Sequence, residues 1–411
     1  MKILIWTQYF WPENFHINAV ACSLHAQGVE VTVLTGKPNY PEGKIFAGYS
    51  ATGIVREQYS GFEVIRIPLR QRGKNSSVGL AFNYLSFIVS GYLFAPYALR
   101  SRKFDAVFVY APSPLLQALP AIFVAWLKGA PLILWVQDVW PDALEVTGFI
   151  KKRWILAAVG LAVRYIYQFS DLILIQSEGF RAFVERWTNK KETIVFHPNS
   201  SEEILFKPEM KGLDSGIAKT MILDFAVVFA GNIGTAQGCE TIIEAACLLR
   251  DMPTIKFYLI GGGSMVESIG ESVKYKQLEN VVMTGRVPAE EMGPIYAAAS
   301  ALLLTLRDQP ALSSTLPSKL QSYLAAGKPI IASCNGESVK IVNDADAGIT
   351  CPAGDSRALA AAVRQLYVMS AAERSRFGKN GRSYFESHFD LQVRAKELIA
   401  HFRSVCAASV S

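Results

Sequence analysis

Short, almost uninterrupted apolar runs rich in Val, Ile and Leu recur along the chain, separated by longer segments of helical character. Strands that are apolar on both sides are buried on both faces, which is typical of a parallel sheet covered by helices. In the first half, the predicted strands are residues 2–6, 29–35, 63–67, 105–110, 132–136, 172–176 and 193–196. In the second half, they are residues 225–230, 256–260, 281–284, 301–306 and 329–332. The pattern predicts an α/β protein with two Rossmann-like, doubly wound domains.

A polar, proline-containing stretch at residues 197–210 separates the two series of strands. We therefore predict an N-terminal domain at residues 1–198 and a C-terminal domain at residues 199–385. The last residues read as helix, so residues 386–411 are predicted to form a helix that packs back on the N-terminal domain.

Residues 78–99 form an apolar stretch without a charge, and basic residues flank it on both sides. Its length is sufficient to cross a bilayer. Asn83, Gly91 and Pro96 lower its hydrophobicity, and a spanning helix would place strands of one sheet on opposite sides of the membrane. Three interpretations stay open: a membrane span, a buried crossover helix, and a helix lying in the membrane interface. For the interfacial helix, the stretches around Trp126, Trp154 and Tyr167 would enlarge the apolar surface.

The composition is that of a folded protein, with 51% hydrophobic and 18% charged residues in 411. Six cysteines occur without a paired Cys-x-x-Cys spacing, which predicts neither a zinc site nor a disulfide framework. The net charge of +6 lies in the first half, where residues 1–200 carry +7 and residues 201–411 carry −1. No nucleic-acid motif accompanies this charge, so an anionic membrane surface or a phosphorylated substrate is the expected partner, and nucleic acid is not.

Candidate chemistry follows the strands of the second half, because ligands of open parallel sheets bind beyond the carboxyl ends of strands. Gly231, Asn232 and Gly234 lie in a glycine-rich turn that leads into a helix near Glu240. Gly262 lies in a second such turn after the next strand, where a side chain would block a nucleoside. Neither turn has the dinucleotide-binding fingerprint, so NAD is not the leading ligand.

The segment at residues 312–329 is the most specific of these signals. Ser314 and Thr315 precede Pro317 at a predicted helix start, and Ser318 and Lys319 lie in the first turn. A cation there opposes the helix dipole unless an anion is bound. Lys319 is therefore a candidate anion ligand, with exposure to solvent as the alternative.

In the first half, Asp138 and Asp142 follow a strand beside two tryptophans, an arrangement that suits sugar hydroxyls and equally suits helix capping. Glu13 and His16 follow the first strand, where a substrate would meet the chain. These four residues are the predicted substrate ligands.

Seven segments in order resemble the family-four glycosyltransferases of the GT-B fold, and among them the WbuB-like branch of O-antigen and capsule assembly. They are QYFWPENFHIN, VTVLTGKPNYPEGK, QDVWPDAL, HPNSSEEILF, FAGNIGTAQG, VVMTGRVPAEEM and TLPSKLQSYLAAGKPIIAS. The resemblance implies two domains facing across a cleft, with the nucleotide-sugar donor on the C-terminal domain and the acceptor on the N-terminal one.

The same resemblance implies roles for single residues. Gly231, Asn232 and Gly234 would face the donor phosphates, Arg286 and Val287 the base, and Thr315, Ser318 and Lys319 the diphosphate. The expected catalytic residues are Lys319, Arg286 and Asp138. The chain departs from the family where two glutamates are common, because Ser314 and Ser322 stand there, and Thr235 and Gln137 replace a basic residue and a histidine.

The implied reaction is transfer with retention, without a metal, because positioned cations and N–H groups can stabilise a leaving diphosphate. The resemblance further implies a UDP-sugar donor such as UDP-N-acetyl-L-fucosamine and an undecaprenyl-diphosphate-linked saccharide acceptor. It implies peripheral contact with the cytoplasmic face of the bacterial inner membrane. Three other functions are weighed: a UDP-sugar 2-epimerase, an inert nucleotide-sugar-binding subunit and a dehydrogenase.

Overall fold

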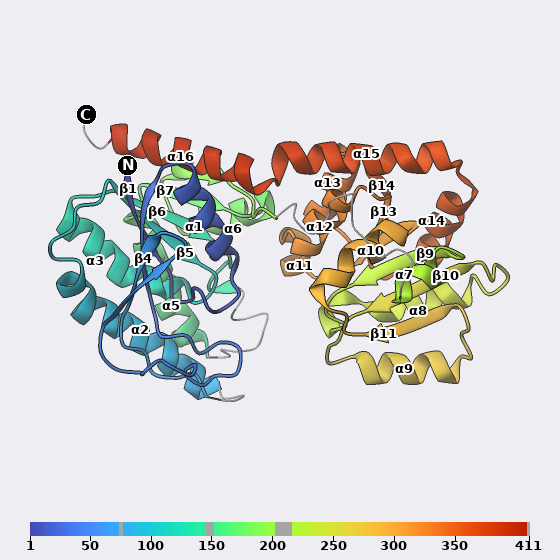
Figure 1. Ribbon diagram of the computed structural model, residues 1–411, viewed down its shortest axis with the longest axis horizontal. Coiled ribbons are helices and arrows are strands. Elements are labelled where there is room, and N and C mark those ends of the chain that lie inside the picture. Colours follow the sequence, from blue (N-terminus) through green and yellow to red (C-terminus); the bar gives the residue numbers. More distant parts are fainter. Residues whose placement is uncertain (74–76, 143, 145–151, 202–215, 409–411) are drawn as a thin grey trace. The chain divides into compact units, whose positions relative to one another are not determined.

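The computed structural model describes residues 1–73, 77–142, 144, 152–201 and 216–408. The chain divides into two compact units (Figure 1): unit 1 holds residues 1–199 and 391–411, and unit 2 holds residues 200–390. Of the predicted linker at 197–210, and of the segment HPNSSEEILF, only residues up to Ser201 are described. Ala143 of QDVWPDAL likewise lies outside the described residues.

Unit 1 is built on an eight-stranded sheet in the order β3-β4-β2-β1-β5-β6-β7-β8, parallel except for the β3–β4 pair. Its strands are β1 (Lys2–Trp6), β2 (Glu30–Thr35), β3 (Val55–Tyr59), β4 (Phe62–Arg66), β5 (Ala106–Ala111), β6 (Leu132–Val136), β7 (Leu172–Ile175) and β8 (Ile194–Phe196). Its α-helices are α1 (His16–Ala26), α2 (Ser77–Ala98), α3 (Ala118–Lys128), α5 (Arg153–Gln168), α6 (Arg181–Glu185) and α16 (Leu391–Ala408).

Side-chain alternation along the strands assigns the helices of unit 1 to the two faces of the sheet. In β1, Ile3 and Ile5 join the core formed with α1 and α16, whereas Leu4 and Trp6 join the core formed with α2, α3 and α5. Both faces are therefore buried, as the uninterrupted apolar strands predict.

Unit 2 has a six-stranded parallel sheet in the order β11-β10-β9-β12-β13-β14. Its strands are β9 (Phe225–Ala230), β10 (Ile255–Ile260), β11 (Val281–Gly285), β12 (Ala301–Thr305), β13 (Ile330–Ser333) and β14 (Gly348–Cys351). Its α-helices are α7 (Gly216–Met221), α8 (Cys239–Cys247), α9 (Val266–Tyr275), α10 (Met292–Ala298), α11 (Pro310–Ser314), α12 (Ser318–Ala326), α13 (Glu337–Asp344), α14 (Ser356–Val368) and α15 (Ala371–His388). The predicted fold class, two doubly wound parallel-sheet domains, is confirmed.

The sequence analysis missed two edge strands. β3 is antiparallel, and its five residues alternate between partly buried and exposed, so it lacks a continuous apolar run. β14 has only four residues and includes a glycine. Edge strands have a neighbouring strand on one side alone and are less buried than central strands. Their sequences therefore show a weaker run of apolar residues, and this run is what the prediction of strands depends on.

The C-terminal helical segment is divided differently from the prediction. The chain from 371 to 388 is one helix, α15, in unit 2, and a break at Phe389 and Asp390 precedes α16. Phe389 is buried in the core of unit 2, so the break between α15 and α16 belongs to unit 2. The segment that packs in unit 1 therefore begins at Leu391 rather than at residue 386.

Helix α2 connects β4 to β5 of one sheet and is a crossover helix in this structure. It is also the one helix, among the described residues, that is long and apolar enough to cross a membrane. Phe87, Ala95 and Ala98 on its inner side join the core of unit 1, and Asn83 is fully buried. Most of its remaining side chains are exposed.

Candidate active site

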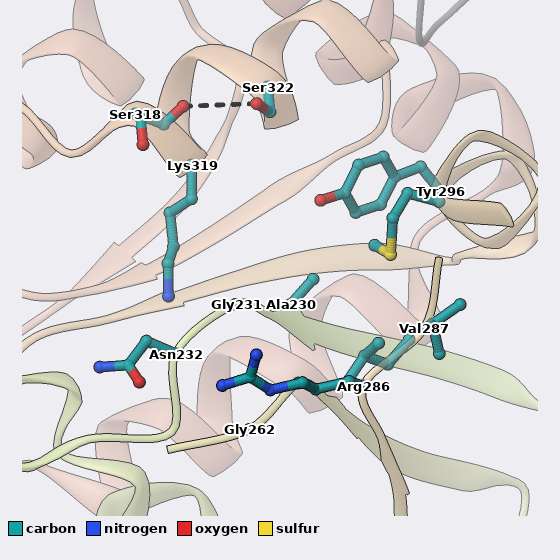
Figure 2. A pocket seen from close by; sticks show the side chains of 13 residues that line it. Ala230, Gly231, Asn232, Gly262, Arg286, Val287, Tyr296, Ser318, Lys319 and Ser322 are labelled. Atoms are coloured by element: carbon teal, nitrogen blue, oxygen red, sulfur yellow. Dashed lines mark hydrogen bonds between the residues drawn. The ribbon is translucent and has the colours of Figure 1, made fainter. Parts of the chain in front are cut away.

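A pocket of about 480 Å³ lies in unit 2 beyond the carboxyl ends of β9, β10 and β11. The strand register brings Ala230 beside Ile260, and Ile260 beside Gly285, so loops distant in sequence meet there. Figure 2 shows the side chains that face the space. The lining residues are Ala230, Gly231, Asn232, Ile260, Gly261, Gly262, Arg286, Val287, Met292, Tyr296, Ser318, Lys319 and Ser322.

Glycines let two of these loops cross in close contact. Gly261 has φ of +141°, and a Cβ placed there would lie 1.8 Å from the carbonyl oxygen of Gly231. Gly231 itself donates its N–H to the carbonyl of Ile260 at 2.8 Å. Only glycine fits at position 261, and the crossing keeps the floor of the pocket free of side chains.

Lys319 enters the pocket from the first turn of α12, and its amino group points toward Asn232 (Figure 2). Its Nζ donates to Oε1 of Gln237 at 2.7 Å and lies 3.9 Å from the centre of the Phe229 ring. Burial lowers its pKa to about 8. Among the described residues no carboxylate is paired with this amino group, so it is a partly buried cation available to an anionic ligand.

Arg286 and Val287 lie on another side of the pocket, in the loop after β11. The Arg286 side chain lies against the backbone of Gly262, because a Cβ at Gly262 would be 2.7 Å from its Nε. Val287, Met292 and Tyr296 form the apolar part of the lining. The pocket thus combines two cationic side chains with an apolar wall, which suits a ligand with an anionic and an aromatic part.

Three predicted donor ligands are not brought into the pocket lining. Gly234 lies in the turn that leads to α8, and its carbonyl accepts from the N–H of Gln237. The hydroxyls of Ser314 and Thr315 both donate to the carbonyl of Ala311, at 3.1 and 2.7 Å. Their role as phosphate ligands stays a prediction.

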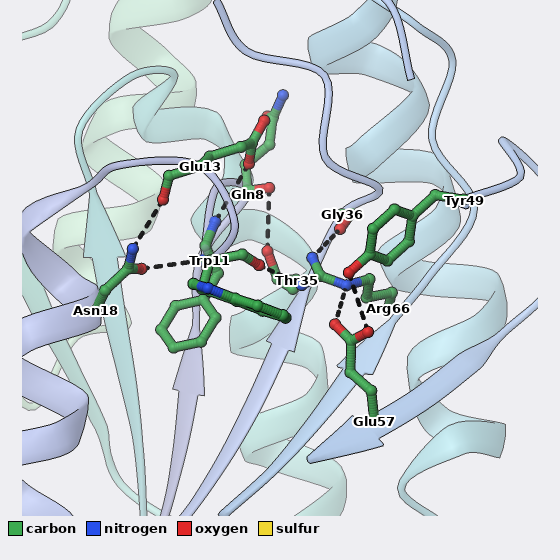
Figure 3. A network of polar contacts seen from close by, with 10 residues as sticks. Gln8, Trp11, Glu13, Asn18, Thr35, Gly36, Tyr49, Glu57 and Arg66 are labelled. Carbon is green, nitrogen blue, oxygen red and sulfur yellow. Dashed lines mark hydrogen bonds and ion pairs between the residues drawn. The ribbon is translucent and has the colours of Figure 1, made fainter. Parts of the chain in front are cut away.

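Glu13 lies at the carboxyl edge of the sheet in unit 1 and is almost fully buried (Figure 3). Its Oε1 accepts from the N–H groups of Asn39 and Tyr40, both at 2.7 Å, and Oε2 accepts from the N–H of Phe10 at 3.3 Å. Burial raises its pKa to about 7. These contacts make Glu13 an anchor of two loops, and its contact with a substrate stays a prediction.

The other predicted substrate ligands occupy different environments of unit 1. Asp138 follows β6, and burial raises its pKa to about 7. Asp142 is paired with Arg186 at 2.9 Å. The ring of His16 packs edge-on against Trp135 at 5.9 Å between centroids, and burial lowers its pKa to about 4. With a pKa of about 7, Asp138 is partly protonated near neutral pH, and the His16 imidazole is neutral there. The contact of these residues with a substrate stays a prediction.

A buried polar network at the same edge was missed by the sequence analysis. Nε2 of Gln8 donates to Oδ1 of Asn83 at 2.7 Å, and Nδ2 of Asn83 donates to Oδ1 of Asn39 and to the carbonyl of Arg70. Arg66 joins it by donating to the carbonyls of Gly36 and Trp11 and to the carboxylate of Glu57 (Figure 3). Each residue lies in an unremarkable local sequence, and only the fold brings them together.

In unit 2, the analysis missed Gln237, Met292 and Tyr296. Gln237 was within reach of sequence reasoning, because it stands in the glycine-rich turn GNIGTAQG. Met292 and Tyr296 lie on α10 and reach the pocket only because that helix packs beside α12.

Comparison with known proteins agrees with this architecture. The family described as Glycosyl transferases group 1 matches residues 224–368, and the glycosyl transferase 4-like domain matches residues 14–200. Over 344 residues the chain is 29% identical to a protein of Escherichia coli (strain K12) assigned as a colanic acid biosynthesis glycosyl transferase, WcaI, covering 80% of this chain and 82% of that one. It is 27% identical over 365 residues to the glycosyltransferase assigned as WbjE of Pseudomonas aeruginosa, covering 84% and 85%.

Among solved structures, the fold matches that of Anabaena Alr3699/HepE in complex with UDP, with a TM-score of 0.71, 14% identity and coverage of 98% of this chain and 100% of that one. The fold is therefore that of a GT-B glycosyltransferase, and the protein is an enzyme of that class. The match to the glycosyl transferases group 1 model falls in unit 2, and the match to the glycosyl transferase 4-like domain falls in unit 1.

Proposed function

We propose that the protein transfers a sugar from a UDP-sugar to a lipid-linked saccharide during the assembly of a bacterial surface polysaccharide. The observation that carries the donor site is Lys319, whose partly buried amino group lines the pocket together with two glycine-rich loops. In the described part of the chain this amino group has no carboxylate partner. The assigned role of WcaI in colanic acid biosynthesis and the UDP complex of Alr3699/HepE support the polymer class and the nucleotide.

The chemistry requires stabilisation of a leaving diphosphate rather than a protein nucleophile. Lys319 and Arg286 both line the pocket, and their cationic groups can compensate the charge that develops on the phosphate oxygen. Gly231 and Gly262 leave room for close approach of that group. Val287 and Tyr296 would contact the base.

Retention at the anomeric carbon is the expected outcome. In the proposed reaction, the acceptor oxygen attacks the face from which the diphosphate departs, and the departing phosphate oxygen takes the proton of the acceptor hydroxyl. We propose an N-acetylated deoxysugar such as N-acetyl-L-fucosamine as the transferred group, on the resemblance to the WbuB-like branch.

Unit 1 offers a surface suited to a membrane that carries the acceptor. The outer side of α2 exposes Phe82, Leu85, Leu93 and Tyr97, among other large apolar residues. Neither α2 nor the neighbouring helices α3 and α5 contain an aspartate or glutamate. An apolar helix face without acidic residues suits insertion into the interface of an anionic bilayer.

Helices α3 and α5 extend this surface beside α2 (Figure 1). Trp126 on α3 is 74% exposed and Trp154 on α5 is 70% exposed. Tyr92 of α2 contacts Phe123 of α3, at 5.7 Å between ring centroids. Tryptophan is enriched where membranes meet water, so we propose peripheral contact with the cytoplasmic face of the inner membrane through this face.

The donor proposal is tested by calorimetric titration of UDP, GDP and dTDP into the chain in the presence of EDTA. We expect UDP to bind most tightly and Lys319→Ala to weaken UDP binding by about 10- to 100-fold, because a charge-assisted contact is lost. Lys340→Ala is the matched control, since Lys340 is an exposed cation of the same unit on α13. Equal weakening by both variants, or a preference for GDP, would contradict the proposal.

Transfer itself is measured with membranes that contain undecaprenyl-diphosphate saccharides and a panel of UDP-sugars. We expect a labelled sugar to enter the lipid fraction and Lys319→Ala to abolish this incorporation. A chain that binds UDP but transfers to no lipid-linked saccharide would show that the acceptor proposal is wrong.

The membrane surface is tested by co-sedimentation with phosphatidylglycerol and phosphatidylcholine vesicles. We expect binding to the anionic vesicles and its loss in the double variant Trp126→Ser, Trp154→Ser. Tyr275→Ser is the control, because Tyr275 is equally exposed but lies on α9 of unit 2. Unchanged binding by the double variant would overturn this surface assignment.

A further inference from the structure

Two histidines and a glutamate meet in unit 1, and none of them lines the pocket of unit 2. One of them, His197, packs against Trp135, which also contacts His16. His197 follows β8, and its side chain is 1% exposed. Glu397 and His401 lie one turn apart on α16 and therefore on one side of that helix. Each residue offers one ligand atom, and these three atoms all lie within 4.8 Å of one another.

The two imidazoles contain buried nitrogens that the surrounding protein does not satisfy. In the described part of the chain, Nδ1 of His197 and Nε2 of His401 have no hydrogen-bond partner. Buried polar atoms in folded proteins nearly always have a partner. A neutral imidazole carries a lone pair on one ring nitrogen, and a metal ion can accept it.

Surrounding contacts hold the backbone of His197 and the carboxylate of Glu397 in place. The backbone N–H of His197 donates to the carbonyl of Ile175 at 2.9 Å, and its carbonyl accepts from Nε1 of Trp135 at 2.9 Å. Arg394 donates to Oε2 of Glu397 at 2.5 Å, and this oxygen lies 3.5 Å from Nδ1 of His197. The distance of 3.5 Å is too long for a hydrogen bond and close to the separation of two ligands on one ion.

We propose that His197, Glu397 and His401 bind one divalent transition-metal ion of the zinc class. Two neutral imidazoles and a carboxylate form a ligand set that zinc uses, with a fourth position left for water. Glu397 is 41% exposed, which gives such a water access from solvent. We assign the ion a structural role, because its three ligands join the end of β8 to α16 within unit 1.

The position of the three residues defines what the ion stabilises. The chain leaves unit 1 after Asn199 and re-enters it at Leu391. His197 lies just before the exit, whereas Glu397 and His401 lie in the second turn and beyond on the returning helix. An ion held by all three cross-links the two ends of unit 1 and fixes α16 to the end of β8.

The site is tested with the tag-free full-length chain after treatment with EDTA and its removal. Titration with Zn²⁺ and with Co²⁺ is expected to give one site per chain, and the Co²⁺ complex is expected to show the visible bands of nitrogen and oxygen ligation. Zn²⁺ is expected to raise the unfolding temperature of unit 1. A thiolate charge-transfer band would place the ion on one of the free cysteines and overturn the proposal.

Variants separate the proposed ligands from other metal-binding residues. His401→Ala and Glu397→Gln are each expected to weaken Zn²⁺ binding by about 10- to 100-fold or more. His388→Ala is the control, because His388 is an exposed histidine at the end of α15 in unit 2. If His401→Ala does not fold, Glu397→Gln decides, since it preserves the shape of the side chain. Wild-type affinity in folded Glu397→Gln would overturn the proposal.

Discussion

At the scale of single residues, burial of the Lys319 amino group has a consequence for the pH dependence of donor binding. Its pKa of about 8 in the free protein means that the amino group loses its charge above pH 8. A bound diphosphate favours the protonated form, and the diphosphate itself titrates near pH 6. We expect UDP affinity to fall by about tenfold per pH unit above pH 8, measured by calorimetric titration between pH 7 and 10.

Lys319→Arg distinguishes this titration from a general loss of structure at high pH. An arginine stays protonated throughout the range, so the affinity of this variant for UDP is expected to be weaker at pH 7.5 and constant up to pH 10. A parallel fall of affinity in both proteins would assign the effect to another group.

The crossing of the two glycine-rich loops gives a second prediction at this scale. Gly261→Ala would place a Cβ against the Gly231 carbonyl at a positive φ, and we expect a loss of about 2–3 kcal/mol of stability together with the loss of UDP binding. Gly270→Ala, within helix α9, is the control. A Cβ at Gly270 would lie 3.9 Å from Sδ of Met283, which is an ordinary contact distance. Denaturant unfolding measures both, and a Gly261→Ala protein as stable as its control would contradict the close approach.

At the scale of elements, α2 has two sides with different chemistry. Asn83 on its inner side is fully buried and bonded to Gln8, Asn39 and Arg70. We expect Asn83→Ala to cost about 1–3 kcal/mol in the free energy of unfolding, because its partners lose their hydrogen bonds in the interior. Leu93→Ala, on the exposed side, is expected to change stability by less than about 0.5 kcal/mol. Equal effects measured by urea unfolding would mean that α2 is not packed against the sheet in this orientation.

At the scale of the whole molecule, the chain forms two units with separate cores, and the last helix belongs to the first of them. Phe402 of α16 is fully buried and packs against Phe108 of β5, at 5.2 Å between ring centroids. Phe402→Ala is expected to lower the stability of unit 1 by about 3–5 kcal/mol, whereas Val393→Ala, at a half-exposed position of the same helix, has a small effect.

Calorimetric unfolding with and without UDP separates the two units. UDP at 100 times its dissociation constant is expected to add roughly 2.7 kcal/mol to the free energy of unfolding of unit 2 and so to raise its unfolding temperature. The unfolding temperature of unit 1 is expected to stay the same. Phe402→Ala is expected to change only the unfolding temperature of unit 1. If the chain shows a single transition, and both UDP and Phe402→Ala shift it, the two units unfold together.

Sequence reasoning identified the central strands because they are buried on both faces, and burial on both faces needs only a run of apolar residues. It also singled out Gly231 and Lys319, because they stand directly after a strand and at a helix start, where local geometry restricts what a residue can do. Arg286, which also lines the pocket, came from the resemblance to a known family. The linking of those segments into one pocket was an inference from the topology of parallel sheets.

Other features depend on contacts between distant segments and leave no local pattern. Tyr296 faces the pocket, and Ser314 does not, because of how α10, α11 and α12 pack. Glu13 is bonded to backbone groups of a loop 26 residues away in the sequence. The same is true of His197, whose neighbours in space, Glu397 and His401, lie on the last helix.

Hydrophobic periodicity and glycine at strand ends are local properties, so the two α/β domains, the parallel sheets and the loops that line the pocket of unit 2 could be predicted from the sequence. The buried side of α2, the polar groups that meet in the interior and the packing of the terminal helix became known from the three-dimensional structure alone. Those outcomes depend on the shapes of surfaces that come together after the elements have formed, and a one-dimensional pattern does not contain that information.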